Sequence, residues 1–552
     1  MLLSNLNLLA TAPGGAAKLR ELILTLAVQG KLVPQDPADE PASVLLQKIR
    51  AEKDRLIAEG KIKRDKPLAE IAEEEKPFEL PAGWEWVRLG DITNYGTTTK
   101  VERLQPDTWV LDMEDIEKSS GRLLQRLRFA QRPALSDKNC FLAGDVLYGK
   151  LRPYLNKVLV ADEDGVCTTE VIPFRCYGNY VPQYFRLVLS SPFFLEYVNA
   201  RSYGMKMPRL GTEDARKSVI PLPPLAEQSR IVTRVEALMR LCDALEAKGQ
   251  LEAAQHAQLV STLLGTLTAS TTPEELAANW QRVAQHFDLL LDRPEAIDAL
   301  EQTLLQLAVR GLLVPQDPTD EPASALLQKI RAEKDRLIAT GQIKRDKPLP
   351  PITDEEKPFA LPVGWEWVRV ATAFDTTSGS TFNPELEKET GTYMYVKVGD
   401  MNLPGNEVEI TTSSRFVDPG ERDLKALIPS GSIIFPKRGG AIATNKKRVV
   451  SKPIFVDLNT MALTPCLIPT EYALLWLMTV DLASLNTGTS VPQINHKDID
   501  PLPFPLPPFA EQSRIVTRVT ALRRLCTDLR QRLAERQSVQ ARLAEALMAF
   551  VA

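Results

Sequence analysis

One short segment of this chain has the spacing of a phosphate-binding loop. Residues 144–150 read Gly-Asp-Val-Leu-Tyr-Gly-Lys, and in a true loop of this pattern backbone N–H groups and the lysine hold a phosphate. Leu151 stands where a serine or threonine would hold magnesium, and Asp-Val-Leu-Tyr favours a strand. The corresponding segment 431–437 has Pro436 in place of the second glycine. We therefore predict strands here and no nucleotide site.

Other residue types that carry catalysis are sparse. The three histidines (256, 286 and 496) are too few and too scattered for a metal site or a Ser/His/Asp arrangement. Residues 74–76 and 355–357 (Glu-Glu-Lys in both) have the acid-x-lysine form of nucleases, but a solvated charge run is the more ordinary interpretation. The Asn-Pro-Pro-aromatic element of adenine methyltransferases does not occur. The sequence therefore predicts a protein with no catalytic, cofactor or metal site of its own.

Basic and polar residues in short loops suit contact with nucleic acid. Arginine and lysine contact phosphates, and small residues beside them let the backbone approach closely. Arginine, asparagine and glutamine can also make paired hydrogen bonds to base edges. An ordinary solvated loop is the alternative at each position. We predict DNA contacts at Lys150, Arg152, Tyr154, Asn156, Lys157, Lys206 and Arg209, and in a second region at Lys437, Arg438, Asn445, Lys446, Lys447, Arg448, Gln493 and Asn495.

The framework that must position these loops occurs twice. Residues 31–68 return at 312–349 with 33 of 38 positions identical, and residues 221–245 return at 505–529 with 20 of 25 identical. The stretches between these copies hardly resemble each other. The repeat period is far too long for a solenoid unit. The sequence therefore predicts one duplicated body that carries two diverged inserts.

Each half is predicted to follow the same order of elements. Residues 19–32 have apolar side chains at helical spacing, and residues 39–60 form a second helix that Gly60 ends. A charged joint (61–81) precedes an aromatic strand, Gly-Trp-Glu-Trp-Val, at 83–87, which repeats in the second half. The inserts have short β-branched and aromatic runs broken by Gly, Pro and Asn, which predicts α+β domains with mostly short strands.

The inserts also share a faint skeleton. Residues 144–150 align with 431–437, and residues 204–210 align with 488–494. Spacing is kept while the side chains change. We predict that the inserts have the same fold with different surfaces.

A long helix follows each insert after a proline block. Apolar residues recur at alternating steps of four and three in both copies, which is a heptad seam. Two matched seams in one chain favour pairing of the two helices with each other, and the N-terminal segment is predicted to pack beside the C-terminal helix in a pseudo-twofold arrangement. The predicted helix-pairing residues are Ile231, Val235, Leu238, Leu245, Ile515, Val519, Leu522 and Leu529.

Composition is that of an ordinary globular protein. The 552 residues are 44% hydrophobic and 25% charged, and the net charge of −4 gives no global support for nucleic-acid binding. We expect no signal peptide in the first ten residues and no membrane span, because no run of eighteen apolar residues occurs. The six cysteines lack CxxC pairing, so buried thiols in a reducing compartment are expected.

Taken together, these features resemble the specificity subunits of type I restriction–modification systems. The motifs that carry the resemblance are Leu-Pro-x-Gly-Trp-Glu-Trp-Val-Arg before each insert and Ala-Glu-Gln-Ser-Arg-Ile-Val after it. In that family two target-recognition domains each read half of a bipartite, asymmetric DNA site, and antiparallel helices set the gap between the halves. The resemblance implies this fold and a non-enzymatic, DNA-recognising function for the chain.

The resemblance also implies partners and cellular context. Two modification subunits, which are adenine methyltransferases, would bind the repeated regions, and restriction subunits would join that core. S-adenosylmethionine, ATP and Mg²⁺ are expected on those partners and no cofactor on this chain. We expect a prokaryotic cytoplasmic protein that binds double-stranded DNA. The alternative is a protein-binding scaffold with two diverged interaction domains.

The expected architecture has five parts. Two α+β target-recognition domains are separated by long antiparallel helices that form a coiled-coil spacer, with a pseudo-twofold internal repeat. The parts are an N-terminal helical segment (1–83), the first recognition domain (84–222), a central helical spacer (223–364), the second recognition domain (365–506) and a C-terminal long helix (507–552).

Overall fold

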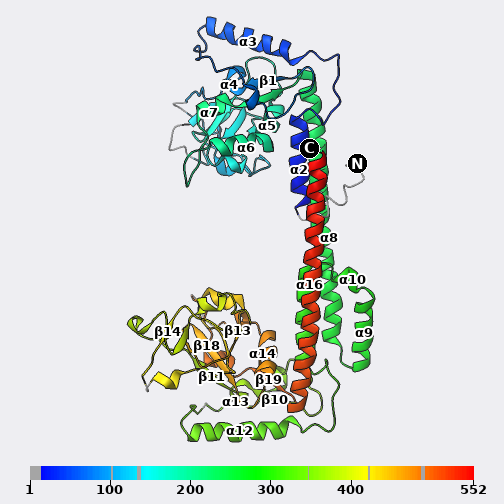
Figure 1. Ribbon diagram of the computed structural model, residues 1–552, viewed down its shortest axis with the longest axis vertical. Coiled ribbons are helices and arrows are strands. Elements are labelled where there is room, and N and C mark those ends of the chain that lie inside the picture. The colour runs from blue at the N-terminus through cyan, green and yellow to red at the C-terminus, as the bar shows by residue number, and fades with distance from the viewer. Residues whose placement is uncertain are drawn as a thin grey trace. The chain divides into compact units, whose positions relative to one another are not determined.

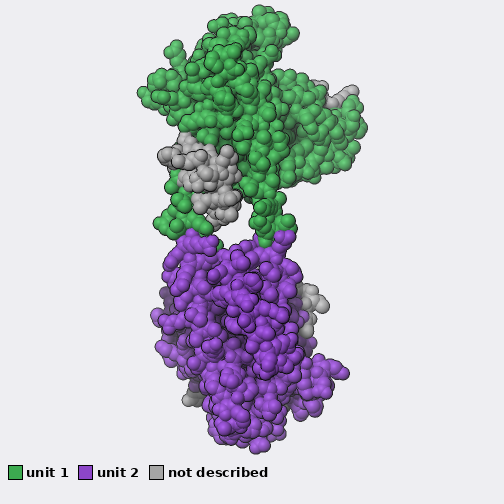
Figure 2. Space-filling model, turned by 90° about the vertical axis from the view of Figure 1, so that its right-hand side faces the viewer, with its two compact units in different colours: residues 1–252, 537–552 green, residues 253–536 purple. Residues whose placement is uncertain are grey.

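The computed structural model describes residues 14–100, 104–132, 138–345, 347–420, 423–486 and 491–551. It divides into unit 1, residues 1–252 with 537–552, and unit 2, residues 253–536 (Figure 2). The first ten residues, where no signal peptide is predicted, lie outside the described residues. Two long helices contribute to both units: α8 (Leu225–Ala269) and α16 (Phe509–Val551).

Unit 1 begins with two helices of the repeated framework. They are α2 (Gly15–Val28) and α3 (Ala42–Ala58). The apolar face of α2, which includes Leu19 and Ile23, packs in one cluster with Ala544 near the end of α16 (Figure 1). Lys18 Nζ also lies 2.6 Å from a carboxylate oxygen of Glu545. These contacts confirm that the N-terminal segment packs beside the C-terminal helix.

The first insert is an α+β domain. Strands β1 and β9 pair antiparallel at its two ends, and the other strands form a four-stranded sheet (order β3-β2-β7-β4) and a three-stranded sheet (order β6-β5-β8). The strands are β1 (Glu85–Arg88), β2 (Trp109–Leu111), β3 (Leu127–Arg128), β4 (Lys138–Phe141), β5 (Val146–Gly149), β6 (Val158–Val160), β7 (Gly165–Thr168), β8 (Val171–Phe174) and β9 (Val219–Leu222). The helices are α4 (Leu89–Ile92), α5 (Pro182–Ser190), α6 (Pro192–Arg201) and α7 (Thr212–Lys217). Strand β5 occupies the segment with phosphate-loop spacing, which confirms the strand prediction.

Unit 2 repeats the framework and adds a small helical pair. Outside the insert, its helices besides α8 and α16 are α9 (Pro273–Gln285), α10 (Phe287–Leu290), α11 (Pro294–Val309) and α12 (Ala323–Ala339). Helices α11 and α12 correspond to α2 and α3. Helices α9 and α10 lie beside α8 (Figure 1).

The second insert has a related but larger set of strands. Strands β10 and β19 pair antiparallel at its ends, and the rest form sheets of order β11-β18-β15-β16-β13 and β14-β12-β17. The strands are β10 (Glu366–Arg369), β11 (Phe374–Ser378), β12 (Tyr393–Val396), β13 (Glu409–Ile410), β14 (Phe416–Val417), β15 (Ile433–Pro436), β16 (Arg448–Val450), β17 (Phe455–Val456), β18 (Thr460–Pro465) and β19 (Pro503–Leu506). The helices are α13 (Val370–Ala373), α14 (Thr470–Thr479) and α15 (His496–Ile499). Both inserts are α+β, as predicted, and the five-part division of the chain stays a prediction.

The repeated motifs around each insert are structural anchors. In unit 1, Trp84 Nε1 donates to Glu227 Oε2 at 2.9 Å, and Gln35 Nε2 donates to Glu227 Oε1 at 2.8 Å. In unit 2, Trp365 donates to Glu511 in the same way at 2.9 Å. Burial raises the pKa of both glutamates. Because a buried carboxylate must be hydrogen-bonded, these contacts tie the strand before each insert to the helix after it.

A second anchor explains the acidic runs of the joints. Arg88 Nη2 lies 2.7 Å from Glu75 Oε2, and Arg369 Nη1 lies 2.7 Å from Glu356 Oε1. Both arginines are buried, and each also donates to backbone carbonyls of the joint. The acid-x-lysine runs therefore hold the joints against β1 and β10, which agrees with the non-catalytic interpretation.

The prediction that the two heptad seams pair with each other is wrong, although two of the predicted pairing residues, Leu522 and Leu529, do pack with the other long helix. Ile231, Val235 and Leu238 pack in the core that α2 and the first insert share. Ile515 and Val519 pack in the core of the second insert, and Leu522 and Leu529 pack with α11 and with Val260 and Leu264 of α8. The long helices do pair, but the start of each meets the end of the other. In that arrangement the two seams, which both lie near helix starts, cannot meet. The remaining seam residue, Leu245, is partly buried.

Candidate nucleic-acid interface

In the first insert, two of the predicted loops lie against each other. Arg152 N donates to Pro208 O at 2.7 Å, and Leu210 N donates to Lys150 O at 3.1 Å. These hydrogen bonds join a loop after β5 to a loop after α6. The fold therefore brings the candidates at 150–157 together with those at 206–209.

The second insert makes the same pair of contacts at corresponding positions. Gly439 N donates to Pro492 O at 2.8 Å, and Ile494 N donates to Lys437 O at 2.8 Å. The shared backbone pattern confirms the common skeleton predicted for the inserts. Residues 487–490, which include part of the aligned segment 488–494, lie outside the described residues.

Two asparagines among the candidates shape this skeleton. Asn156 ends the 3-10 turn Pro153–Leu155 with φ 50°, and Asn445 ends the turn Gly440–Thr444 with φ 52°. Asparagine tolerates this left-handed conformation better than most residues do. Asn156 Nδ2 donates to Ser190 O at 3.0 Å, and Asn445 Oδ1 accepts from Leu482 N at 3.0 Å. Both side chains therefore brace a turn, a role that the sequence prediction did not include.

The candidate residues differ in solvent exposure, and a side chain must be exposed for a DNA duplex to contact it. Asn156 and Lys447 are buried. The exposed candidates are Arg152, Tyr154, Lys206, Arg438 and Asn445, and the partly exposed ones are Lys150, Lys157, Arg209, Lys437, Lys446, Arg448, Gln493 and Asn495. Contact with DNA stays a prediction for the exposed and partly exposed residues.

Lys447 is corrected from a phosphate contact to a structural residue. Its side chain is 8% exposed, and Nζ donates to Val480 O and to Asn445 Oδ1, both at 2.8 Å. Burial lowers the pKa of the Lys447 ammonium to about 8. The group holds the loop before β16 to the end of α14 and does not face solvent.

Three further cations are partly engaged by the protein itself. Lys157 Nζ donates to Met113 O at 2.6 Å, and Lys437 Nζ donates to Ser378 Oγ at 2.9 Å. Arg448 donates to two backbone carbonyls. Burial lowers the pKa of all three side chains. Each keeps some exposed surface, so its charge still contributes to the local potential.

The first candidate interface also has an apolar part, which was not predicted from the sequence. Tyr203, Met205 and Met207 are exposed in the loop that also carries Lys206. Two methionines in a loop bounded by Gly204 and Pro208, where polar residues are the norm, were the available signal. The sequence predicts DNA contacts in this loop only for its basic residues, Lys206 and Arg209.

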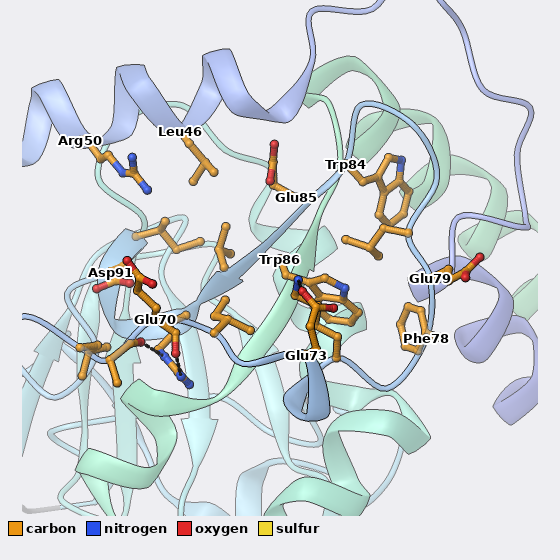
Figure 3. A pocket seen from close by; sticks show the side chains of 18 residues that line it. Leu46, Arg50, Glu70, Glu73, Phe78, Glu79, Trp84, Glu85, Trp86 and Asp91 are labelled. Atoms are coloured by element: carbon orange, nitrogen blue, oxygen red, sulfur yellow. Dashed lines mark hydrogen bonds and ion pairs between the residues drawn. The ribbon is translucent and has the colours of Figure 1, made fainter.

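A second candidate surface lies on the repeated framework. Between α3, the joint and β1 is a cavity of about 870 Å³, into which Leu46 and Arg50 point from α3 (Figure 3). Trp86 and Phe78 form its floor with ring centroids 4.9 Å apart. The exposed positions of α3 are chemically the same in α12: Gln47, Lys48, Arg50, Asp54 and Arg55 correspond to Gln328, Lys329, Arg331, Asp335 and Arg336. Identical exposed residues on the two copies suit two copies of one protein partner.

The described residues offer little for catalysis. Among them, no three His, Cys, Asp or Glu side chains gather as metal ligands would. His496 Nε2 lies 3.1 Å from Ser378 Oγ, and His256 Nε2 donates to Leu289 O at 3.0 Å. No helix in the described part of the chain is long and apolar enough to cross a membrane.

Comparison with known proteins agrees with the duplicated architecture. The family model of the type I restriction modification DNA specificity domain matches residues 81–255 and 362–536. The chain is 37% identical to the type I restriction enzyme EcoAI specificity subunit of Escherichia coli, over 97% of this chain and 93% of that protein. It is 38% identical to the EcoEI specificity subunit of the same organism, with the same coverage of both chains.

A solved structure shares the fold. A chain from work on complex assembly and conformational transition of the type I R-M system superimposes with a TM-score of 0.54 at 20% identity, over 86% of this chain and 99% of that chain.

Proposed function

The chain belongs to the family of type I restriction–modification specificity subunits, and we propose that each of its two inserts reads one half of a bipartite, asymmetric DNA site. The subunit is non-catalytic and serves DNA recognition. Its task is to place partner enzymes on a sequence, which needs base contacts and rigid positioning but no reactive group. Direct readout would come from loops of each insert, mainly in the major groove.

The observation that carries this proposal is the matched loop pair of the inserts. Within the first insert, the hydrogen bond from Arg152 N to Pro208 O holds two loops together. Within the second insert, the hydrogen bond from Gly439 N to Pro492 O holds the equivalent two loops together. At these equivalent positions the side chains differ: Arg152 and Tyr154 of the first insert correspond to Gly439 and Ala441 of the second. A constant backbone with changed side chains is what two readers of different sequences need.

The partners follow from the same reasoning. We propose that two copies of a modification subunit, an adenine methyltransferase that uses S-adenosylmethionine, bind the repeated framework, including the identical exposed faces of α3 and α12. Restriction subunits that use ATP and Mg²⁺ would join this core in the cytoplasm of a prokaryotic cell. Partner subunits around the duplex would supply phosphate contacts, so a reader with a net charge of −4 needs only local basic patches.

A gel-shift experiment separates DNA recognition from a protein-binding scaffold. The chain, alone and with its modification subunits, is titrated onto a duplex that carries its mapped site and onto a random duplex. We expect the complex to prefer the site by about a thousand-fold or more. Equal binding to both duplexes, or no binding in either state, would favour the scaffold. Magnesium-dependent cleavage by the purified chain alone would contradict a non-catalytic subunit.

A further inference from the structure

The loop after α6 is a closed hairpin, here called the 203–209 hairpin. Tyr203 N donates to Arg209 O at 3.1 Å, and Arg209 N donates to Tyr203 O at 2.9 Å. Gly204 has φ +104°, and a Cβ on it would lie 3.1 Å from Met207 O. The left-handed backbone at Gly204 therefore lets the chain turn tightly. Paired ends and a glycine turn hold the tip in a defined conformation.

Large apolar side chains stand on this hairpin without cover. Met205 at the tip is fully exposed, Tyr203 is 61% exposed and Met207 is 45% exposed. Tyr154, on the adjacent turn, is 50% exposed. Apolar side chains gathered on one surface usually mark a binding site, because their exposure to water is unfavourable.

The charges around this apolar group select the class of partner. Lys206 lies at the tip between the two methionines, and Arg152 lies on the neighbouring loop that bonds to Pro208. Arg209 at the base is paired with Glu170 at 3.1 Å. Exposed cations that flank apolar side chains complement a duplex, where phosphates border bases that carry thymine methyl groups.

We propose that the 203–209 hairpin enters the major groove at the first half-site and that Met205 packs against a thymine methyl group. This inference rests on the proposed function and deepens it. Lys206 contacts a phosphate beside that base pair. Tyr203 and Met207 cover the apolar contact from either side. A methionine suits this role because its thioether is flexible and polarizable.

Replacing single thymines of the first half-site by deoxyuridine tests the proposal, because that exchange removes one methyl group and nothing else. Binding of the full complex with modification subunits is measured for wild type and for Met205→Ala. We expect wild type to bind about four-fold more weakly when the contacted thymine is replaced. Met205→Ala is expected to bind both duplexes equally, at the reduced level. Met205 is fully exposed, so its variant keeps the wild-type melting temperature.

Two comparisons isolate the effect. Leu142→Ala removes another exposed apolar side chain, 48% exposed between β4 and β5, and should respond to deoxyuridine as wild type does. Lys206→Ala should make the slope of log affinity against log salt less negative by about one, whereas Met205→Ala should leave that slope unchanged. If every thymine replacement weakened the binding of Met205→Ala by the same factor as it weakens wild type, the proposal would be overturned. Loss of site preference in the wild-type complex would instead overturn the proposed function.

Discussion

At the scale of residues, neighbouring lysines of the second insert have different environments. Lys446 Nζ contacts Asn402 Oδ1 at the surface, and its side chain is partly exposed. Lys447 is enclosed by the loop that it fastens to Val480 O. A phosphate can approach the first ammonium, but the second is already bonded within the protein. The two adjacent lysines therefore have different roles: Lys446 can contact a phosphate, whereas Lys447 holds the fold.

Single variants of the two lysines test this separation. Lys446→Ala should weaken binding of the complex to all duplexes and reduce the salt slope by about one, because one phosphate contact is lost. Lys447→Ala should leave the salt slope unchanged and lower the melting temperature, because Val480 O loses a buried donor. Salt titrations and thermal unfolding of both variants measure this. A reduced salt dependence of binding for Lys447→Ala would show instead that Lys447 contacts DNA.

Lys447 also predicts a pH dependence of stability. Its pKa of about 8 in the fold lies below the value of about 10.4 for an unfolded lysine. Between these values the unfolded chain binds more protons than the folded one, so this group stabilises the fold progressively as the pH rises from about 8 to about 10.4. Thermal unfolding across this range, compared between wild type and Lys447→Met, should show the gain in wild type alone. The same profile in both proteins would contradict the burial of a charged ammonium.

Residue types and spacing predicted which loops of the two inserts are equivalent but not the task of each side chain. The alignment of 144–150 with 431–437 was enough to expect equivalent loops. Whether Asn156 and Asn445 face a duplex depends on their left-handed backbone and on partners far away in sequence, Ser190 and Leu482. Such partners follow from tertiary packing, which local sequence does not encode.

At the scale of elements, a glycine controls how the repeated framework packs. Gly30, after α2, has φ +70°, and a Cβ on it would lie 2.4 Å from Pro81 Cγ and 3.0 Å from Trp84. Gly60, after α3, has the same φ, but a Cβ there would meet nothing within 4 Å. Both glycines have the same left-handed backbone, but only at Gly30 would an added Cβ meet neighbouring atoms.

This difference gives a matched pair of variants. Gly60→Ala should cost about 1–2 kcal/mol, the penalty of a left-handed alanine. Gly30→Ala should cost more, because Pro81 and Trp84 must also move, and Trp84 is held by its hydrogen bond to Glu227. Urea unfolding of both variants measures the order. Equal losses would show that the close approach at Gly30 has no energetic weight.

Element order and type were largely readable from sequence, whereas the partner of each helix face was only partly so. Helices, proline joints and aromatic strands follow from spacing and propensity. The apolar spacing from Ile231 onward is the same whether the helix packs against another long helix or against the core of a domain. Only the fold shows that it packs on the core of the first insert and on α2.

At the scale of the molecule, α8 and α16 are segments that the two units share. If these helices set the gap between half-sites, seven residues inserted in α8 after Glu252 and in α16 after Arg536 should widen the gap. Seven residues add about 10 Å of helix, the rise of about three base pairs. The methylated sequences of cells with this variant should keep both half-sites and gain about three unspecified base pairs between them.

The length of the insertion supplies its own control. Seven residues return each helix nearly to its starting rotation, whereas five rotate it by about 140° and should abolish methylation. An unchanged gap after the seven-residue insertion would mean that the helices do not set the spacing.

Exchange of one insert tests the central claim, that two independent readers share one body. Residues 88–220 are replaced by the corresponding insert of another specificity subunit, and methylated adenines are mapped genome-wide in cells that carry the hybrid system. The account predicts a new sequence at one half-site, with the other half-site and the gap unchanged. Altered sequences at both half-sites would contradict it.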